Sequence, residues 1–239
     1  MTTAPLLDLH ALTKRYGARR GVTGVSLQVH EGEVFGFLGP NGAGKTTTLR
    51  LVMGFLKPDS GHARVAAHDC WTDPVAVKRL VGYLPTGMAL DPALTGRQLL
   101  EYFANLRGGV DPRYVSQLAE RFGLDLSRKF RQYSHGNQQK VGIVQAFMHR
   151  PRLLLLDEPT SGLDPLNQQE FANLVRETRD GGRTVFLSSH VMSEVEDLCD
   201  RVAIIREGAI VHVGPLESIR TDPNQSLHQA FMRLYLGGA

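Results

Sequence analysis

The sequence has little cysteine: Cys70 and Cys199 are the two cysteines among 239 residues, and they form no CxxC pair. Two thiols so far apart in the chain fit reduced core residues better than a disulfide or a metal site. The nine histidines show no metal-ligand spacing, so the sequence does not indicate zinc.

Long apolar runs are also missing. No stretch approaches the roughly 18 apolar residues that a membrane-spanning helix needs. Polar residues from Asp8 to Arg15 interrupt the N-terminus too early for a secretory signal. From these two absences we expect a cytoplasmic chain.

An excess of one charge is missing as well. Lysine and arginine number 27 against 24 aspartate and glutamate, and no basic run is longer than a pair such as Arg19-Arg20. The charges therefore give no case for nucleic acid as a partner. Apolar residues make up 42% and charged residues 21%, as in ordinary soluble proteins. The length suits one α/β domain with a subdomain better than two independent domains.

What the sequence does contain is a phosphate-binding loop of the form G-x-x-x-x-G-K-[ST]. It follows an apolar run, Val34 to Leu38, which predicts a buried strand, and it leads into a helix-forming stretch, Thr47 to Leu56. The residues of the loop are Gly39, Pro40, Asn41, Gly42, Ala43, Gly44, Lys45, Thr46 and Thr47. The pattern predicts binding of a nucleoside triphosphate. The alternative is an ordinary glycine-rich turn between a strand and a helix.

The spacing of this loop suits triphosphate chemistry. Glycines let backbone N–H groups close around phosphates, while the following helix directs its positive N-terminal end at them. Lys45 can reach the β- and γ-oxygens as a point charge, and the hydroxyl of Thr46 is placed to ligate Mg²⁺.

Apolar periodicity divides the rest of the chain. Residues 6–29 partly alternate, which predicts antiparallel strands, whereas residues 88–150 show helical spacing and predict a mostly helical subdomain. Beyond residue 150, short apolar strands alternate with helical segments, as in a parallel sheet covered by helices. Near the C-terminus we expect one amphipathic helix, in a docking role rather than as a partner site, through Leu227, Phe231, Leu234 and Tyr235.

A pair of carboxylates, Asp157 and Glu158, ends the apolar strand Leu153 to Leu156. The first carboxylate is expected to hold Mg²⁺ and the second to orient or deprotonate the attacking water. The pair gains weight from three neighbouring segments that occur in one order: Tyr133-Ser134-His135-Gly136-Asn137-Gln138-Gln139, Ser161-Gly162-Leu163-Asp164 and Ser188-Ser189-His190.

With these segments the chain resembles the ATP-binding subunits of ABC transporters, from about residue 5 to residue 215. The resemblance implies an α/β fold: a P-loop NTPase core with a mainly parallel sheet, an N-terminal antiparallel β subdomain and an inserted α-helical subdomain. We expect a single ABC ATPase domain over residues 1–239. Its expected parts are a nucleotide-binding core at 5–87 and 151–215, a helical signature subdomain at 88–150 and a tail at 216–239.

The resemblance also implies roles for single residues. Tyr16 looks like the aromatic residue that stacks on adenine, Glu158 like the catalytic carboxylate and His190 like the switch histidine. The alternatives are simple packing for Tyr16 and a plain surface or core position for His190. The implied cofactors are ATP and Mg²⁺, with Thr46 and Asp157 on the metal.

A second ATP-binding subunit is implied too, because in this family two domains sandwich two ATP molecules head to tail. Ser134 and the N–H of Gly136 would then bond the γ-phosphate of the opposite ATP. The γ-phosphate supplies differential affinity for the closed dimer, and its loss lets the dimer open. Asp164 is expected to carry signals across that interface, with a helix N-cap alone as the alternative.

The sequence departs from the common family pattern in two places. Thr86 stands where a glutamine is usual after the strand at 81–85, and its hydroxyl has a shorter reach toward the metal. In the signature segment Tyr133, His135 and Asn137 replace the common Leu, Gly and Gln, and we expect His135 to face solvent. Both departures resemble ATPases that serve drug, antibiotic and lipid exporters.

The favoured function is therefore the ATPase motor of an exporter of a small amphipathic molecule. It would lie on the cytoplasmic side of the membrane, bound to a separate polytopic permease. One alternative is a soluble ABC-type ATPase acting on ribosomes or nucleic acid, although such proteins usually carry tandem ATPase domains or a long insertion. Here one phosphate loop is present, and Lys45 and Ser134 are 89 positions apart. Another alternative, a regulatory module that never hydrolyses ATP, is disfavoured by Glu158.

Overall fold

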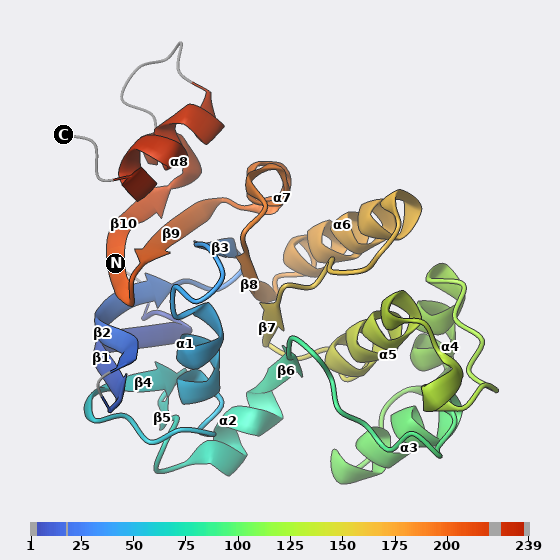
Figure 1. The fold of residues 1–239 in the computed structure, drawn as a ribbon. Coiled ribbons are helices and arrows are strands. Elements are labelled where there is room, and N and C mark those ends of the chain that lie inside the picture. The colour runs from blue at the N-terminus through green and yellow to red at the C-terminus, as the bar shows by residue number, and fades with distance from the viewer. Residues whose placement is uncertain (1–3, 18, 220–225, 237–239) are drawn as a thin grey trace.

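Two β-sheets and the helices around them form the computed structural model, which describes residues 4–17, 19–219 and 226–236 (Figure 1). The smaller sheet is antiparallel, with strand order β2-β1-β4-β5. Its strands are β1 (Leu7–Tyr16), β2 (Arg19–Val29), β4 (Ser60–Val65) and β5 (His68–Asp69). This sheet confirms the antiparallel strands predicted for residues 6–29.

The larger sheet has six strands in the order β10-β9-β3-β8-β7-β6. Five of them run parallel, and β10 is antiparallel to β9 at one edge. The strands are β3 (Val34–Leu38), β6 (Val81–Leu84), β7 (Leu153–Asp157), β8 (Thr184–Ser189), β9 (Arg201–Arg206) and β10 (Ala209–Pro215). All residues of β3, β7 and β8 are buried, as expected for central strands that are covered on both faces.

Helices cover both faces of the larger sheet, and three of them, α3, α4 and α5, gather beside it as a separate group (Figure 1). The helices are α1 (Lys45–Val52), α2 (Pro74–Leu80), α3 (Gly96–Leu106), α4 (Pro112–Arg121), α5 (His135–Phe147), α6 (Pro165–Asp180), α7 (Met192–Leu198) and α8 (Leu227–Leu236), with short 3₁₀ turns η1 (Phe130–Gln132) and η2 (Leu216–Ile219). Together with the two sheets these helices give the α/β architecture that the sequence predicts: a mainly parallel sheet, an antiparallel β part and a group of helices beside them.

Alternating side chains of β3 join the two halves of the hydrophobic core. Phe35 and Phe37 point into a cluster between the two sheets, where both rings pack on Phe186 with centroids 5.6 and 5.4 Å apart. Val34 and Leu38 point the other way, into the cluster beneath α5, α6 and α7. Burying large apolar side chains on both faces contributes about 1.5–3 kcal/mol each, so β3 is a fixed base for the loop that follows it.

Local signals set the ends of the helices near the site. Ser134 caps α5 and Asp164 caps α6, and each side-chain oxygen accepts a hydrogen bond from a backbone N–H in the first turn. Pro165 at the first position of α6 adds a fixed φ that suits a helix start.

The helix after the phosphate loop is shorter than predicted. The sequence pattern predicts a helix from Thr47 to Leu56, but α1 runs from Lys45 to Val52. Gly54 ends it, because this residue has φ 65° and a Cβ there would lie 2.4 Å from the carbonyl oxygen of Cys70. Beyond the turn, Leu56 is partly buried against the cluster between the two sheets, whereas Phe55 is 52% exposed.

The helix predicted near the C-terminus is confirmed as α8. Ala230 is fully buried, and Phe231 packs against the core cluster beneath α5, α6 and α7. The side chains of Leu227, Leu234 and Tyr235 lie outside the described part of the structure.

Candidate functional site

The phosphate-binding loop connects β3 to α1 and forms the floor of an open cavity of about 210 Å³. Gly42 and Gly44 have φ of 81° and 113°, a backbone region that side-chain-bearing residues rarely adopt. These two glycines let the loop bend tightly before the helix begins. The cavity is lined by Gly21, Pro40, Asn41, Gly42, Gly44, Lys45, Thr46, Thr47, Thr86 and Glu158.

Lys45 extends its ammonium group to the centre of this site, although the residue is only 5% exposed. The Nζ atom donates to the carbonyl oxygens of Gly39 at 2.5 Å and Pro40 at 3.2 Å, and it lies 3.0 Å from Oε1 of Glu158. A nearly buried cation needs anionic or carbonyl partners on every side. The lysine is therefore held where a phosphate oxygen can compete for its third donor.

Asp157 ends β7 and is fully buried. Its Oδ2 accepts a hydrogen bond from Thr46 Oγ1 at 2.7 Å, and its Oδ1 accepts one from Ser188 Oγ at 2.5 Å. The three residues come from α1, β7 and β8, so the parallel sheet brings them together at the carboxyl ends of its strands. One carboxylate beside one hydroxyl is the sparse set that suits Mg²⁺ when phosphates supply further ligands.

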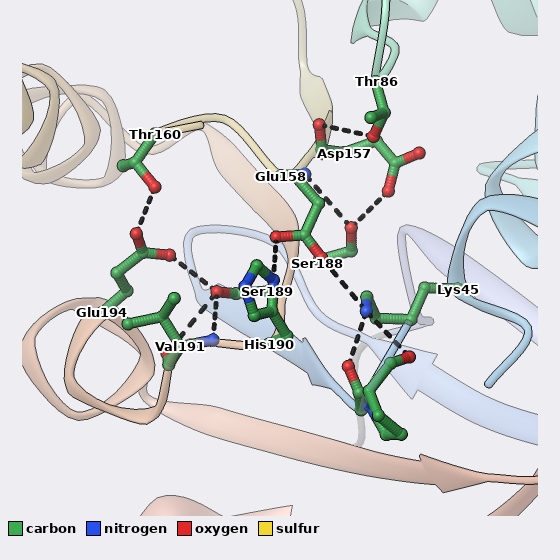
Figure 2. A network of polar contacts seen from close by, with 12 residues as sticks. Lys45, Thr86, Asp157, Glu158, Thr160, Ser188, Ser189, His190, Val191 and Glu194 are labelled. Carbon is green, nitrogen blue, oxygen red and sulfur yellow. Dashed lines mark hydrogen bonds and ion pairs between the residues drawn. The ribbon is translucent and has the colours of Figure 1, made fainter. Parts of the chain in front are cut away.

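Glu158 lines the cavity, and its side chain meets that of His190 (Figure 2). Nδ1 of His190 lies 2.6 Å from Oε2 of Glu158, and the His190 side chain is half exposed. The backbone N–H of Glu158 donates to the carbonyl oxygen of Ser188 at 3.1 Å and lies 3.3 Å from its hydroxyl oxygen. Glu158 has φ 51°, and a strained backbone held by such bonds is typical of functional positions.

Thr86 lies in this site at the end of β6. It lines the cavity, and its hydroxyl donates to the carbonyl oxygen of Asp157 at 3.2 Å. The threonine thus ties the end of β6 to the end of β7. Contact between the Thr86 hydroxyl and a metal ion stays a prediction from the sequence.

The remaining predicted residues lie away from the cavity lining. Tyr16 is 41% exposed at the end of β1, while Ser134 and Asp164 are exposed helix caps. Gly136 lies in close packing, because a Cβ there would come within 2.4 Å of the carbonyl oxygen of Gly162. The signature segment therefore contacts the loop after Glu158 within the same chain.

Within the phosphate loop itself, Gly39 and Ala43 lie behind the cavity. A Cβ on Gly39 would approach the carbonyl oxygen of Ile205 to 2.5 Å, and Ala43 is buried. His135 is exposed, as predicted, although its ring packs against Gly162.

Sequence reasoning missed three contributors. Gly21 lines the cavity, but the sequence indicated only a turn there. Ser188 belongs to the segment that carries His190, but its contact with Asp157 needed the pairing of β7 with β8. Gln139 donates through Nε2 to the carbonyl oxygens of Glu158 at 3.2 Å and Pro159 at 2.9 Å. The sequence feature that could have identified Gln139 is its position on the inner face of the helix that follows Ser134.

The local environment also shifts some pKa values. Burial, together with the negative charge of Asp157, raises the pKa of Tyr83 to about 12. Burial raises the pKa of the Cys70 thiol to about 12 and moves that of Cys199 further in the same direction. Both cysteines are free and buried, so neither provides a thiolate near neutral pH.

Two kinds of feature are absent from the described residues. Among residues 4–17, 19–219 and 226–236, no group of three or more His, Cys, Asp or Glu side chains is placed to hold a metal ion. Over the same residues, no helix combines the length and apolar character that crossing a bilayer requires.

Comparison with known proteins gives a consistent result. The model of the ABC transporter family matches residues 22–161. The uncharacterized ABC transporter ATP-binding protein YdbJ of Bacillus subtilis is 39% identical over 209 residues, which cover 86% of this chain and 68% of the relative. The daunorubicin/doxorubicin resistance ATP-binding protein DrrA of Streptomyces peucetius is 35% identical over all of this chain and 73% of its own.

Solved structures agree with these relatives. An ATP-binding subunit of an ABC transporter has a TM-score of 0.89 and 30% identity, covering 96% of this chain and 99% of its own. A dimeric ATP-binding cassette bound to ADP and Pi shares the fold, with a TM-score of 0.79 and 22% identity over 87% of this chain and 98% of its own. Because the family model covers more than half of the chain, this protein belongs to the ABC transporter family, as one of its ATP-binding, ATP-hydrolysing subunits.

Proposed function

We propose that this subunit drives an exporter by binding and hydrolysing Mg²⁺-ATP in the cavity at the phosphate loop. One observation carries the proposal: Lys45, Asp157, Glu158 and His190 converge on one site from α1, β7 and the end of β8. A cation, a buried carboxylate, a second carboxylate and an imidazole are the groups that phosphoryl transfer to water requires.

The phosphates are bound by the loop backbone and by Lys45. The residues that would hold Mg²⁺ are Thr46 and Asp157, which already lie 2.7 Å apart. When bound, the metal neutralises charge on the β- and γ-phosphates. Ser188 keeps Asp157 oriented for this role through the bond to its other oxygen.

Hydrolysis then depends on Glu158. The Glu158 side chain is only 14% exposed, and its two carboxylate oxygens face Lys45 and His190. From this position the carboxylate orients a water molecule against the γ-phosphate and accepts a proton from that water. His190 holds the carboxylate in place and reaches toward the γ-phosphate. Tyr16, exposed at the edge of the smaller sheet, stacks on adenine.

The complete site is shared between two subunits. Ser134 and Gly136 lie at the start of α5, outside the cavity of their own chain, so they are available to a γ-phosphate held by a second copy or a related chain. Asp164 would lie at the same interface and carry signals across it. The dimeric cassette with the same fold supports this arrangement.

Export through a separate polytopic permease follows from the relatives and the signature segment. DrrA is by its name a resistance protein for daunorubicin and doxorubicin, and Tyr133, His135 and Asn137 carry the exporter-like departures noted above. The subunit would work at the cytoplasmic face of the membrane and move a small amphipathic molecule. Action on ribosomes or nucleic acid has no supporting observation.

The substitution Glu158→Gln tests the proposed chemistry. It keeps the shape of the side chain but removes the base, so turnover should fall by about a hundredfold or more while ATP binding and ATP-dependent dimers persist. The measurements are phosphate release and size-exclusion chromatography with ATP, and Glu196→Gln, an exposed position on α7, is the control. Unchanged phosphate release would remove Glu158 from its role.

A purification tests the partner. The tagged chain is isolated from membranes in mild detergent, and stoichiometric companions are identified by mass spectrometry. A polytopic membrane protein is the expected companion, whereas recovery with ribosomes or nucleic acid alone would contradict the exporter.

A further inference from the structure

Glu194, on the first turn of α7, joins two loops of the site that are far apart in sequence (Figure 2). Its Oε1 accepts a short hydrogen bond from the hydroxyl of Thr160, which lies two residues after Glu158. Its Oε2 accepts a hydrogen bond from the hydroxyl of Ser189 at 2.6 Å. Ser189 directly precedes His190, so one carboxylate holds a neighbour of each residue proposed to act at the γ-phosphate.

The serine end of this bridge is rigid. Ser189 is fully buried, and its oxygen also accepts a hydrogen bond from the backbone N–H of Val191 at 2.9 Å. The hydroxyl has a single hydrogen, and the 2.6 Å contact with Glu194 takes it. The backbone on both sides of His190 is therefore fixed by one serine, which is itself fixed by Glu194.

The threonine end belongs to the loop between β7 and α6. Glu158, at the start of this loop, has its strained backbone held on one side by Ser188 and on another by Gln139 of α5. Thr160 is the loop's connection to α7. Since the N–H of Leu163 bonds to the carbonyl oxygen of Thr160 at 3.0 Å, the bridge also reaches the turn that leads to Asp164.

We propose that Glu194 is a positioning residue for ATP hydrolysis, which holds the loop of Glu158 and the loop of His190 in register through the hydroxyls of Thr160 and Ser189. The proposal rests on the roles proposed above for Glu158 and His190. Those two side chains are 2.6 Å apart but come from different loops, so their contact depends on what fixes the loops to each other.

The geometry predicts which substitutions preserve the bridge. Glutamine has the same length, and it can accept from the serine hydroxyl while donating to the oxygen of the threonine hydroxyl. Aspartate is one methylene shorter, so it cannot reach both hydroxyls. Alanine removes the bridge altogether.

The test measures ATP hydrolysis by the full chain with Glu194→Ala, Glu194→Asp and Glu194→Gln. We expect the alanine and aspartate variants to lose about tenfold in kcat with KM for ATP changed less than about twofold, and the glutamine variant to stay near wild type. Glu196→Ala, on the exposed side of the same helix, is the matched control. An alanine variant with the turnover of this control, or a loss confined to KM and Tm without rescue by glutamine, would overturn the proposal.

A double-mutant cycle keeps the test valid even if an alanine at 194 folds poorly. Thr160→Val and Ser189→Ala each break one end of the same bridge, so we expect the double variant to lose no more kcat than the worse single one. Additive losses would show that the two loops are not coupled through Glu194 and would contradict the proposal.

Failure of this inference is distinguishable from failure of the proposed function. Normal turnover in Glu158→Gln would remove the chemistry on which the inference depends. Loss of turnover in Glu158→Gln together with normal turnover in Glu194→Ala would leave the function in place and reject Glu194 alone.

Discussion

The phosphate-loop side of the nucleotide site and the signature side differ in where their polar groups find partners. Lys45 is nearly buried and pairs with Glu158, which directly follows β7. Asp157 is fully buried and accepts hydrogen bonds from Thr46 of α1 and Ser188 of β8. Ser134 and Asp164 are exposed, and among the described residues their side-chain oxygens bond only within the first turn of the helix that each one caps. The phosphate-loop side is therefore organised by the tertiary fold, whereas the signature side is organised by local helix caps and faces outward.

The largest expected effect on ATP binding is at Lys45, on the phosphate-loop side. Lys45→Ala removes the buried cation of the phosphate-loop side, so we expect ATP affinity to fall by about a hundredfold or more. Isothermal titration calorimetry measures it, with the exposed Lys57→Ala as control. Wild-type affinity in the Lys45 variant would contradict the phosphate-loop assignment.

The next effect distinguishes the two sides directly. Ser134→Asp keeps a good N-cap for α5 but places a negative charge where a γ-phosphate is proposed to dock. We expect about normal ATP binding by the single chain and a loss of turnover of about tenfold or more.

A mixing experiment sharpens this prediction. In a head-to-tail dimer, Lys45→Ala chains mixed with Ser134→Asp chains form one intact composite site, so phosphate release should recover well above that of either variant alone. No recovery on mixing would mean that the phosphate-loop side and the signature side act within one chain. The structural difference between the two sides would then have no functional meaning.

A smaller effect is expected at Tyr16, which is exposed at the end of β1 and is proposed to stack on adenine. Loss of a stacking ring costs about 1 kcal/mol, so Tyr16→Ala should weaken ATP binding about fivefold, and Tyr16→Phe should bind normally. Fluorescent ATP displacement measures both variants. Equal affinity for all three proteins would leave Tyr16 as a packing residue.

The smallest effect concerns pH and Asp164. Hydrogen bonds from Asn167, backbone first and side chain second, lower the pKa of Asp164 below its ordinary 3.8. Because the folded-state pKa is depressed, this stabilisation is present above the ordinary value and is lost as pH falls through the folded one. The Tm of the wild type should therefore lie slightly above that of Asp164→Asn at neutral pH, and the difference should shrink as the pH falls below the ordinary pKa of 3.8. A constant difference in Tm at all pH values would exclude the charge as its source.

Sequence patterns were sufficient for the parts of the site that are contiguous in the chain. The strand, loop and helix around Lys45 and the acidic pair at the end of β7 follow from local spacing, and parallel pairing then places them at one edge. The predicted C-terminal end of α1 was wrong, because the apolar spacing in the sequence continues past Gly54, where the backbone turns. The bridge through Glu194 was not predictable, because a glutamate on the first turn of a helix has many ordinary uses and its partners come from two other segments.

The left-handed backbone of Glu158 has a consequence for evolution and engineering. A residue with a Cβ is strained at φ 51° and glycine is not, so Glu158→Gly relieves backbone strain. The same substitution leaves the nearly buried ammonium of Lys45 without its anionic partner, and this loss opposes the gain. Selection for folding and selection for turnover are therefore linked at this position, because the ion pair proposed to serve phosphoryl transfer also offsets the cost of the strained backbone.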